Sequence, residues 1–406
     1  MRDKNKLIQE AMDKAVAKKE VAGVNLLVIQ DGKETYYAQS GHANIGKDIP
    51  MNRDTIVHLY SQSKPITAAA AMLLVQDGIV DLNEPVANFF GSFKDQTCVI
   101  DGEIRKLPGD KFVRIVDLLN MTSGLVYPGV NTPAERATSL LFADAIRRLE
   151  CPYENTSDSS SVTADNGRKD YQMTTLEFAD EIGKLPLQFI PGTQFQYGTS
   201  ADVLGAVIEK ATGQKFGDFL KERIFDPLDM KDTGFYVPED KKSRLALAYE
   251  VISGDFSELN GDHLIIRKDG NKNRFESGGA GLFSTLDDYS HFGQMLLNGG
   301  TYNGNQILTP RTVEFMTKSA IMDGPQHAFD NWYGLEGHTY SNLMRILVDP
   351  AKALIIGNKG EYGWDGWLGA YFMNDPESRT TLLMMTQMRD YGTGNLTRRL
   401  RNIVMS

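Results

Sequence analysis

The sequence reads His58-Leu-Tyr-Ser-Gln-Ser-Lys-Pro-Ile-Thr-Ala-Ala-Ala-Ala-Met-Leu-Leu-Val-Gln-Asp-Gly78 in one stretch that begins polar and then becomes almost wholly apolar. About three turns of apolar residues predict a buried helix that starts near Ser61. Its one cation, Lys64, lies at the mouth of this helix. Burying an amine there costs free energy unless another group uses it. The stretch therefore raises the question of what Lys64 does.

Ser61 and Lys64 are three residues apart, so in a helix they lie one turn apart on the same face. The start of a helix offers free N–H groups and a partial positive charge, which favour an alkoxide and an oxyanion. Burial against Ala68–Leu74 disfavours the charged amine, so we expect Lys64 to act as a base on Ser61. The competing interpretation is a chance S-x-x-K match whose lysine extends to water.

A second element, Gly192-Thr-Gln-Phe-Gln-Tyr-Gly-Thr-Ser-Ala-Asp-Val-Leu-Gly205, places a tyrosine directly before a predicted helix. Together the two elements resemble the serine β-lactamase and penicillin-binding-protein superfamily, and more closely class C β-lactamases and family VIII carboxylesterases. The resemblance covers most of the chain. It implies an acyl-enzyme on Ser61 and a proton transfer that Tyr197 shares with Lys64. Thr199 stands at the substrate-binding position of the family's Y-x-N or Y-x-S motif.

The third element is Gly363-Trp-Asp-Gly-Trp-Leu-Gly-Ala-Tyr371, in which Trp364-Asp365-Gly366 replaces Lys-Thr-Gly. Trp-x-Gly is frequent in family VIII esterases, and an indole cannot anchor the carboxylate of a β-lactam or a D-alanyl peptide. The resemblance thus favours a carboxylesterase on short-chain esters. It also implies an oxyanion hole made by the backbone N–H groups of Ser61 and Trp367. The predicted substrate-binding residues are Tyr127, Thr199, Trp364, Gly366 and Trp367.

Several functions stay open beside the esterase. β-Lactamases, D-alanyl or D-amino-acid peptidases and acyltransferases use the same serine, lysine and tyrosine. A non-catalytic penicillin-binding-like protein is also compatible, because Thr199 and Asn120 depart from the family's motifs. Tyr127, Trp332 and Trp367 are each expected either to line an apolar pocket or simply to pack in the core. An α/β-hydrolase is disfavoured, since no G-x-S-x-G elbow is present.

Strand patterns cluster at both ends of the chain. A helical pattern over 4–19 precedes the strand patterns Gly23–Gln30 and Lys33–Gln39, which Asp31-Gly32 joins as a favoured hairpin turn. Towards the other end, strands are predicted at Leu343–Val348, Leu354–Gly357, Leu368–Met373 and Thr380–Gln387, followed by a helix near Leu396–Val404. Helical patterns occupy the middle of the chain, at 63–77, 175–183, 201–212, 216–225 and 285–298.

These patterns predict an α+β fold with an antiparallel sheet built from both chain ends, flanked by helices, and an inserted mainly helical region. The resemblance implies that this fold is β-lactamase-like. The predicted division assigns 1–60 plus 325–406 to the sheet region and 61–324 to the helical region. The polar segment 151–170 is expected to be a surface insertion of a single catalytic unit.

The composition of the chain disfavours several other classes of function. The chain has 406 residues, 41% of them hydrophobic, and a net charge of −10 without a basic cluster, which disfavours nucleic acid. We expect a cytoplasmic protein without a membrane span, acting on a small ester or amide. Two cysteines, Cys98 and Cys151, exclude a disulfide framework, and six scattered histidines do not support a metal site. No cofactor is expected, and the oligomeric state is left open.

Overall fold

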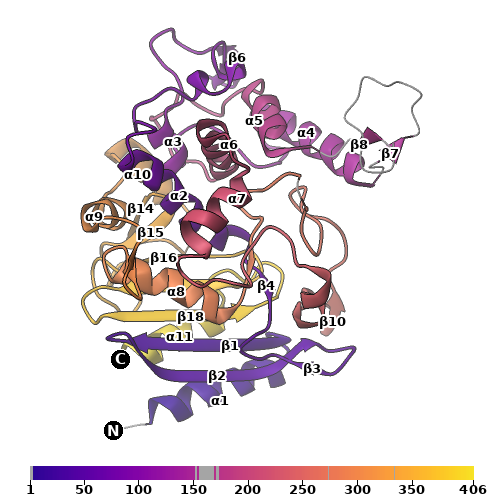
Figure 1. Ribbon diagram of the computed structural model, residues 1–406, viewed down its shortest axis with the longest axis vertical. Coiled ribbons are helices and arrows are strands. Elements are labelled where there is room, and N and C mark those ends of the chain that lie inside the picture. The colour runs from indigo at the N-terminus through magenta and orange to yellow at the C-terminus, as the bar shows by residue number, and fades with distance from the viewer. Residues whose placement is uncertain (1–2, 151–152, 155–168, 171–172, 273, 333) are drawn as a thin grey trace.

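An antiparallel sheet of eight strands, in the order β14-β15-β16-β17-β18-β1-β2-β3, spans the lower part of the computed structural model (Figure 1). The structure describes residues 3–150, 153–154, 169–170, 173–272, 274–332 and 334–406. The strands of this sheet are β1 (Gly23–Gln30), β2 (Lys33–Asn44), β3 (Ile49–Pro50), β14 (His338–Ser341), β15 (Met344–Leu347), β16 (Tyr362–Asp365), β17 (Tyr371–Asp375) and β18 (Thr380–Thr386). Strands from the two ends of the chain meet where β1 pairs with β18.

The described helices gather mainly above the sheet in this view (Figure 1). They are α1 (Lys4–Ala17), α2 (Lys64–Gln76), α3 (Ile115–Leu119), α4 (Pro133–Glu150), α5 (Thr175–Gly183), α6 (Ser200–Thr212), α7 (Phe216–Leu220), α8 (Leu286–Leu297), α9 (Pro310–Lys318), α10 (Asp323–Phe329) and α11 (Asn395–Met405). Shorter helical turns are η1 (Tyr60–Ser63), η2 (Val86–Asn88), η3 (Gly91–Phe93), η4 (Lys221–Phe225, a π-helix) and η5 (Glu239–Arg244). Among these helices, none combines the length and the apolar composition that a membrane span requires.

Five short hairpins or strand pairs complete the described secondary structure. They are β4 (Val57–His58) with β11 (Phe283–Ser284), β5 (Thr97–Ile100) with β6 (Glu103–Lys106), β7 (Tyr153–Glu154) with β8 (Lys169–Asp170), β9 (Tyr249–Ile252) with β10 (Asp255–Glu258), and β12 (Thr301–Tyr302) with β13 (Asn305–Gln306). The pairing of β4 with β11 matters most for the site, because β4 leads directly into η1.

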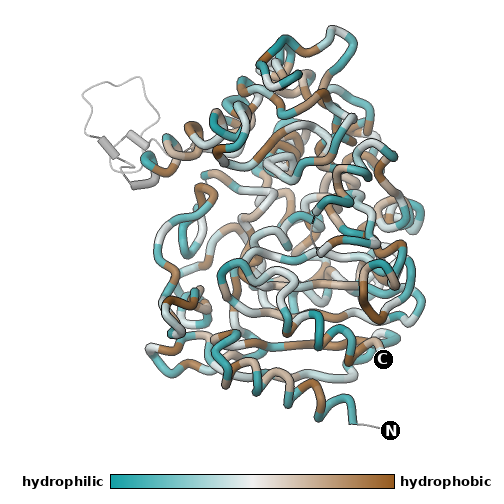
Figure 2. The backbone as a smooth tube through the Cα atoms, turned by 180° about the vertical axis from the view of Figure 1, so that it is seen from behind, coloured by the Kyte–Doolittle hydropathy of each residue, from teal (hydrophilic) through white to brown (hydrophobic). Residues whose placement is uncertain are grey.

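The sheet is buried on both faces, and β1 shows how the sequence achieves this. Alternate side chains of a strand point to opposite faces. Val24, Leu26 and Val28 pack with α1 and α11, whereas Leu27 and Ile29 belong to the larger core that includes α8. Along α1, hydrophobic and hydrophilic residues alternate, as expected of a helix with one buried face (Figure 2).

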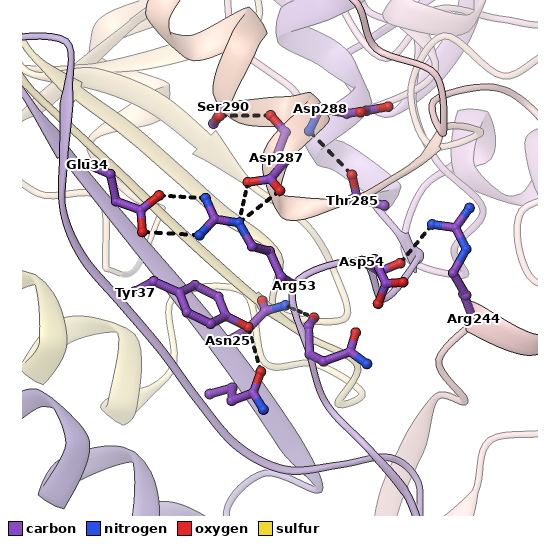
Figure 3. A network of polar contacts seen from close by, with 12 residues as sticks. Asn25, Glu34, Tyr37, Arg53, Asp54, Arg244, Thr285, Asp287, Asp288 and Ser290 are labelled. Atoms are coloured by element: carbon purple, nitrogen blue, oxygen red, sulfur yellow. Dashed lines mark hydrogen bonds and ion pairs between the residues drawn. The ribbon is translucent and has the colours of Figure 1, made fainter.

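A polar cluster attaches the edge of the sheet to α8 (Figure 3). The Arg53 guanidinium donates through Nε to Asp287, at 2.9 Å, and through Nη2 to Glu34, at 2.6 Å. Glu34 lies on β2 and Asp287 on the first turn of α8, so a single arginine in the connecting loop bridges the two elements. Charge-assisted bidentate contacts of this kind fix geometry as well as adding stability.

Helix α2 connects the two halves of the molecule. Every residue from Lys64 to Leu74 is buried, and the helix packs against both α6 and β16. A helix that is apolar on nearly all sides, as α2 is, is stable only where neighbours surround it. Its first turn therefore lies at the boundary between the sheet and the helices, close to segments that are far apart in the sequence.

The predicted fold class is confirmed, with one predicted strand wrong and three strands of the large sheet that the patterns do not predict. The hairpin of β1 and β2 turns at Asp31-Gly32, where both residues have a positive φ as the predicted turn requires. Leu354–Gly357 is not a strand: Asp349 accepts hydrogen bonds from the N–H groups of Ala351 and Lys352, and the chain turns instead. In the large sheet, strands β3, β14 and β16 are the three that the sequence patterns do not predict.

Two other expectations concern the organisation of the chain. The segment 151–170 lies largely outside the described residues. The predicted division at 60/61 and 324/325 stays a prediction, although the strands of the large sheet come only from residues 23–50 and 338–386 of the described chain.

Candidate active site

Ser61 lies in η1, where the chain enters α2, and its side chain is partly exposed. The preceding residue, Tyr60, has a φ of +48°, an uncommon conformation for an aromatic residue. The Tyr60 ring is held by stacking on His58, with ring centroids 3.8 Å apart, and by an edge contact with Trp367 at 5.0 Å. This strained turn leaves Ser61 accessible, although the ten residues that follow it are buried.

Lys64 is fully buried, and its amine has three hydrogen-bond partners. Nζ donates to Ser61 Oγ at 3.1 Å, to Tyr127 Oη at 3.1 Å and to the Gly279 carbonyl at 2.7 Å. Burial lowers the pKa of Lys64 to about 7, against the opposing effect of the Asp202 and Asp365 charges. The amine is therefore available in its neutral form near physiological pH, within hydrogen-bond distance of a serine hydroxyl.

Tyr197 closes the site over the amine. Its ring centroid lies 4.5 Å from Lys64 Nζ, and its hydroxyl accepts a hydrogen bond from Trp364 Nε1 at 3.0 Å. Burial raises the pKa of Tyr197, although hydrogen bonds with Ser61 and Trp364 oppose the shift. The phenol consequently keeps its proton at neutral pH and can donate it.

The third predicted element forms the last residues of β16 and the turn after it. A Cβ on Gly366 would lie 2.1 Å from the Leu59 carbonyl oxygen, so only glycine allows this strand end to approach η1 so closely. Trp367 follows Gly366 and contacts Tyr60 through its ring. This approach is compatible with an oxyanion hole made by the N–H groups of Ser61 and Trp367, which stays a prediction.

The predicted substrate-binding residues occupy different environments. Trp364 is 3% exposed and bonds Tyr197, so it supports the site rather than forming an open wall. Tyr127 contacts the Lys64 amine. Thr199 precedes α6, is fully buried, and its hydroxyl has no hydrogen-bond partner among the described residues. The side chain of Trp367 stacks on His263, with ring centroids 4.0 Å apart.

Sequence reasoning assigned no role to three residues that the fold brings to the site. Asp202 on α6 accepts a hydrogen bond from the N–H of Gly279, whose carbonyl accepts one from Lys64. Arg345 on β15 forms an ion pair with Asp365 at 2.9 Å. The signal for Asp202 was a carboxylate in the first turn of α6, directly before the apolar residues Val203–Ile208; Gly279 lies in a glycine-rich stretch, and Arg345 carried no comparable signal.

The acylation rate should increase with pH through about 7. The neutral amine of Lys64 is the form that can accept a proton, and its pKa is lowered to about 7 by burial. Activity is therefore lost on the acid side, as the amine becomes protonated. The pH profile of kcat/KM for a neutral ester measures this, because it reports the groups of the free enzyme. A rate that does not change with pH across the neutral range would contradict the assignment.

In the described parts of the chain, no three His, Cys, Asp or Glu side chains are grouped to hold a metal ion. The reactive groups of the site are a partly exposed serine, a buried lysine and two partly buried tyrosines. These groups can carry out nucleophilic and proton-transfer chemistry by themselves.

The chain is similar in sequence or in fold to several known proteins. Esterase EstB of Burkholderia gladioli is 27% identical over 412 residues, covering 98% of this chain and 94% of the relative. Lovastatin esterase of Penicillium rubens is 27% identical over 348 residues, covering 80% and 74%. The solved structure of EstCE1, a hydrolase with promiscuous acyltransferase activity, is 23% identical, with a TM-score of 0.78 over 99% of this chain and 98% of that one.

A profile of the Beta-lactamase family matches residues 5–404. The match spans all three motif elements and both chain ends that build the sheet. Since it covers nearly the whole sequence, the protein belongs to the Beta-lactamase family and is a serine hydrolase.

Proposed function

We propose that the protein is a carboxylesterase that hydrolyses short-chain esters of uncharged acids through an acyl-enzyme on Ser61. The observation that carries the proposal is the hydrogen-bonded set of Ser61, Lys64, Tyr197 and Trp364. The first three residues supply a nucleophile, a base and a proton donor. Trp364 donates a hydrogen bond to Tyr197. In the sequence, Trp364 stands at the position where a β-lactamase has a cationic residue.

In this mechanism, the neutral Lys64 amine takes the proton of Ser61 as Oγ attacks the ester carbonyl carbon. The resulting oxyanion is stabilised by backbone N–H groups, for which Ser61 and Trp367 are the candidates. The C–O bond to the alcohol then breaks, and Tyr197 passes the proton to the leaving oxygen. Water, deprotonated by the same groups, releases the acid and regenerates Ser61.

The charge distribution supports an uncharged acyl group. In its charged form, Lys64 already has an acceptor for each of its three N–H groups. Arg345, whose guanidinium lies 5.8 Å from the Trp364 ring, is 4% exposed and paired with Asp365. Neither cation is therefore free to bind a substrate carboxylate. The names of two relatives, esterase EstB and lovastatin esterase, are in line with ester hydrolysis.

A comparison of three substrates tests the proposal: p-nitrophenyl butyrate, a chromogenic cephalosporin and a D-alanyl p-nitroanilide. We expect the ester to exceed the other two in kcat/KM by at least about ten- to a hundredfold, since a charge-assisted hydrogen bond to a carboxylate is worth about 1.5–3 kcal/mol. Equal turnover of the cephalosporin would instead identify a β-lactamase, and preference for the amide a peptidase.

Two more experiments distinguish the esterase from an acyltransferase and from a non-catalytic protein. An added alcohol that captures the acyl group faster than water does would identify an acyltransferase. If a fluorophosphonate probe fails to label the protein, Ser61 is not activated and a non-catalytic function follows.

A further inference from the structure

Asp202 is a buried carboxylate next to the site. It lies in the first turn of α6 and is 3% exposed. Its Oδ1 atom accepts hydrogen bonds from the Gly279 N–H, at 3.0 Å, and from the Ser277 hydroxyl. The Gly279 carbonyl, in turn, accepts a hydrogen bond from Lys64 Nζ at 2.7 Å. One glycine thus connects the carboxylate to the amine.

The space around Gly279 leaves this connection no freedom. A Cβ on Gly279 would lie 2.9 Å from Asp202 Oδ2 and 3.1 Å from the Tyr127 hydroxyl. The backbone is therefore held between the carboxylate and the phenol. Asp202 also accepts a hydrogen bond from the Ser277 hydroxyl, and Ser277 Oγ accepts one from the Ala280 N–H at 2.9 Å. The residues on both sides of Gly279 are therefore tied to the same carboxylate.

Among the described residues, no Arg, Lys or His nitrogen forms an ion pair with Asp202. A buried carboxylate without one costs free energy unless a nearby charge compensates. Burial raises the pKa of Asp202, and Lys64 is the cation whose charge opposes that shift. The other titratable groups facing Lys64 are Tyr127, Tyr197 and Asp365. Of the two carboxylates, only Asp365 has an arginine partner, Arg345.

We propose that Asp202 is a positioning residue: through Gly279 it holds the Lys64 amine against Ser61, and its charge favours proton uptake by that amine. The inference rests on the proposed function and deepens it, because it explains how a lysine in an apolar helix remains basic enough to deprotonate serine. Asp202 itself touches neither Ser61 nor the substrate. Its effect is exerted on the base alone.

The test is the Asp202→Asn variant, which keeps the size of the side chain and removes its charge. We measure the rate of labelling by an aryl fluorophosphonate across the neutral pH range, since this reports Ser61 reactivity without a natural substrate. Without the carboxylate, the ammonium form of Lys64 is less favoured. The acid limb of the profile, in which the labelling rate rises as Lys64 loses its proton, should therefore move to lower pH by about one unit. The plateau rate should change little, because the asparagine Oδ1 can still accept the hydrogen bond from the Gly279 N–H and hold the amine in place, so the shift of the limb isolates the effect of the charge.

Asp288→Asn is the matched control. Asp288 on α8 is also buried, with burial raising its pKa, and it accepts hydrogen bonds from Asp232 N and Thr233 Oγ1. This variant should keep the acid limb at its original pH. A limb that moves equally in both variants, or stays fixed in Asp202→Asn, overturns the inference.

Ser277→Ala covers the case in which Asp202→Asn does not fold. The Ser277 hydrogen bond favours the charged form of Asp202, so its loss should move the acid limb in the same direction by a smaller amount. An unmoved limb here contradicts the inference. Failure of the proposed function has different signatures: an unmodified protein that is not labelled at any pH would be non-catalytic, and one that prefers the cephalosporin or the amide would belong to another substrate class.

Discussion

Replacing Ser61 with alanine lowers ester turnover by about a millionfold in kcat, the loss typical of removing the nucleophile of a serine hydrolase. Among the described residues, the other hydroxyls at the Lys64 amine or next to Ser61 are the phenols of Tyr127 and Tyr197. Burial raises the pKa of both, so neither forms a phenolate that could replace the serine. The kinetics of p-nitrophenyl butyrate hydrolysis measure the effect.

Intact-protein mass spectrometry provides the control for Ser61→Ala. The unmodified protein incubated with the fluorophosphonate should gain one probe mass on the peptide that contains Ser61, and the alanine variant none. Because the Ser61 side chain is partly exposed and lies in a helical turn, alanine should leave the melting temperature almost unchanged. Labelling at another residue, or retained turnover, would refute the assignment of the nucleophile.

Replacing Lys64 with arginine should lower kcat by about 10²- to 10⁴-fold, the typical contribution of a general base. A guanidinium keeps the positive charge but does not lose its proton at any accessible pH. The pocket is also too tight for it, because the amine is fully buried and lies 2.7 Å from the Gly279 carbonyl. The ester assay measures the loss, and an active arginine variant would mean that Lys64 acts only through its charge.

Lys64→Met separates loss of function from loss of fold. Methionine matches the length of the lysine stem and needs no solvation, and the position is surrounded by the buried residues of α2. We expect this variant to be as inactive as Lys64→Arg and to remain folded: methionine ends the cost of burying the amine, while the Gly279 carbonyl loses its hydrogen bond and Asp202 loses its nearby cation. An inactive Lys64→Met protein that does not fold would leave Lys64→Arg as the test of the base.

Local patterns explain why parts of the fold could be predicted. The two-residue turn at Asp31-Gly32 pairs Gln30 with Lys33 at the start of the β1–β2 hairpin, and the apolar run of β1 before the turn is typical of a buried strand. Leu354–Gly357 has the composition of a strand, yet the Asp349 side chain caps the preceding N–H groups and reverses the chain. The strand prediction failed there because a local turn, made by an aspartate side chain and the backbone after it, outweighed the strand preference of the apolar residues.

Burial is the property that local patterns describe least well. The motif positions of Thr199 and Trp364 predict that they bind substrate, but both side chains are enclosed. Motif spacing specifies the residue type and its order along the chain. It does not specify which side of a residue is exposed, because neighbours from distant segments decide that.

The sequence by itself determined the relation between Ser61 and Lys64, since three residues of helix fix two side chains on one face whatever surrounds them. Only the tertiary structure decided how basic the lysine is. Its partners Tyr127, Tyr197, Gly279 and the charge of Asp202 come from segments 63 to 215 residues away in the sequence. A pKa depends on desolvation and nearby charges, and both are properties of the packed molecule rather than of the local chain.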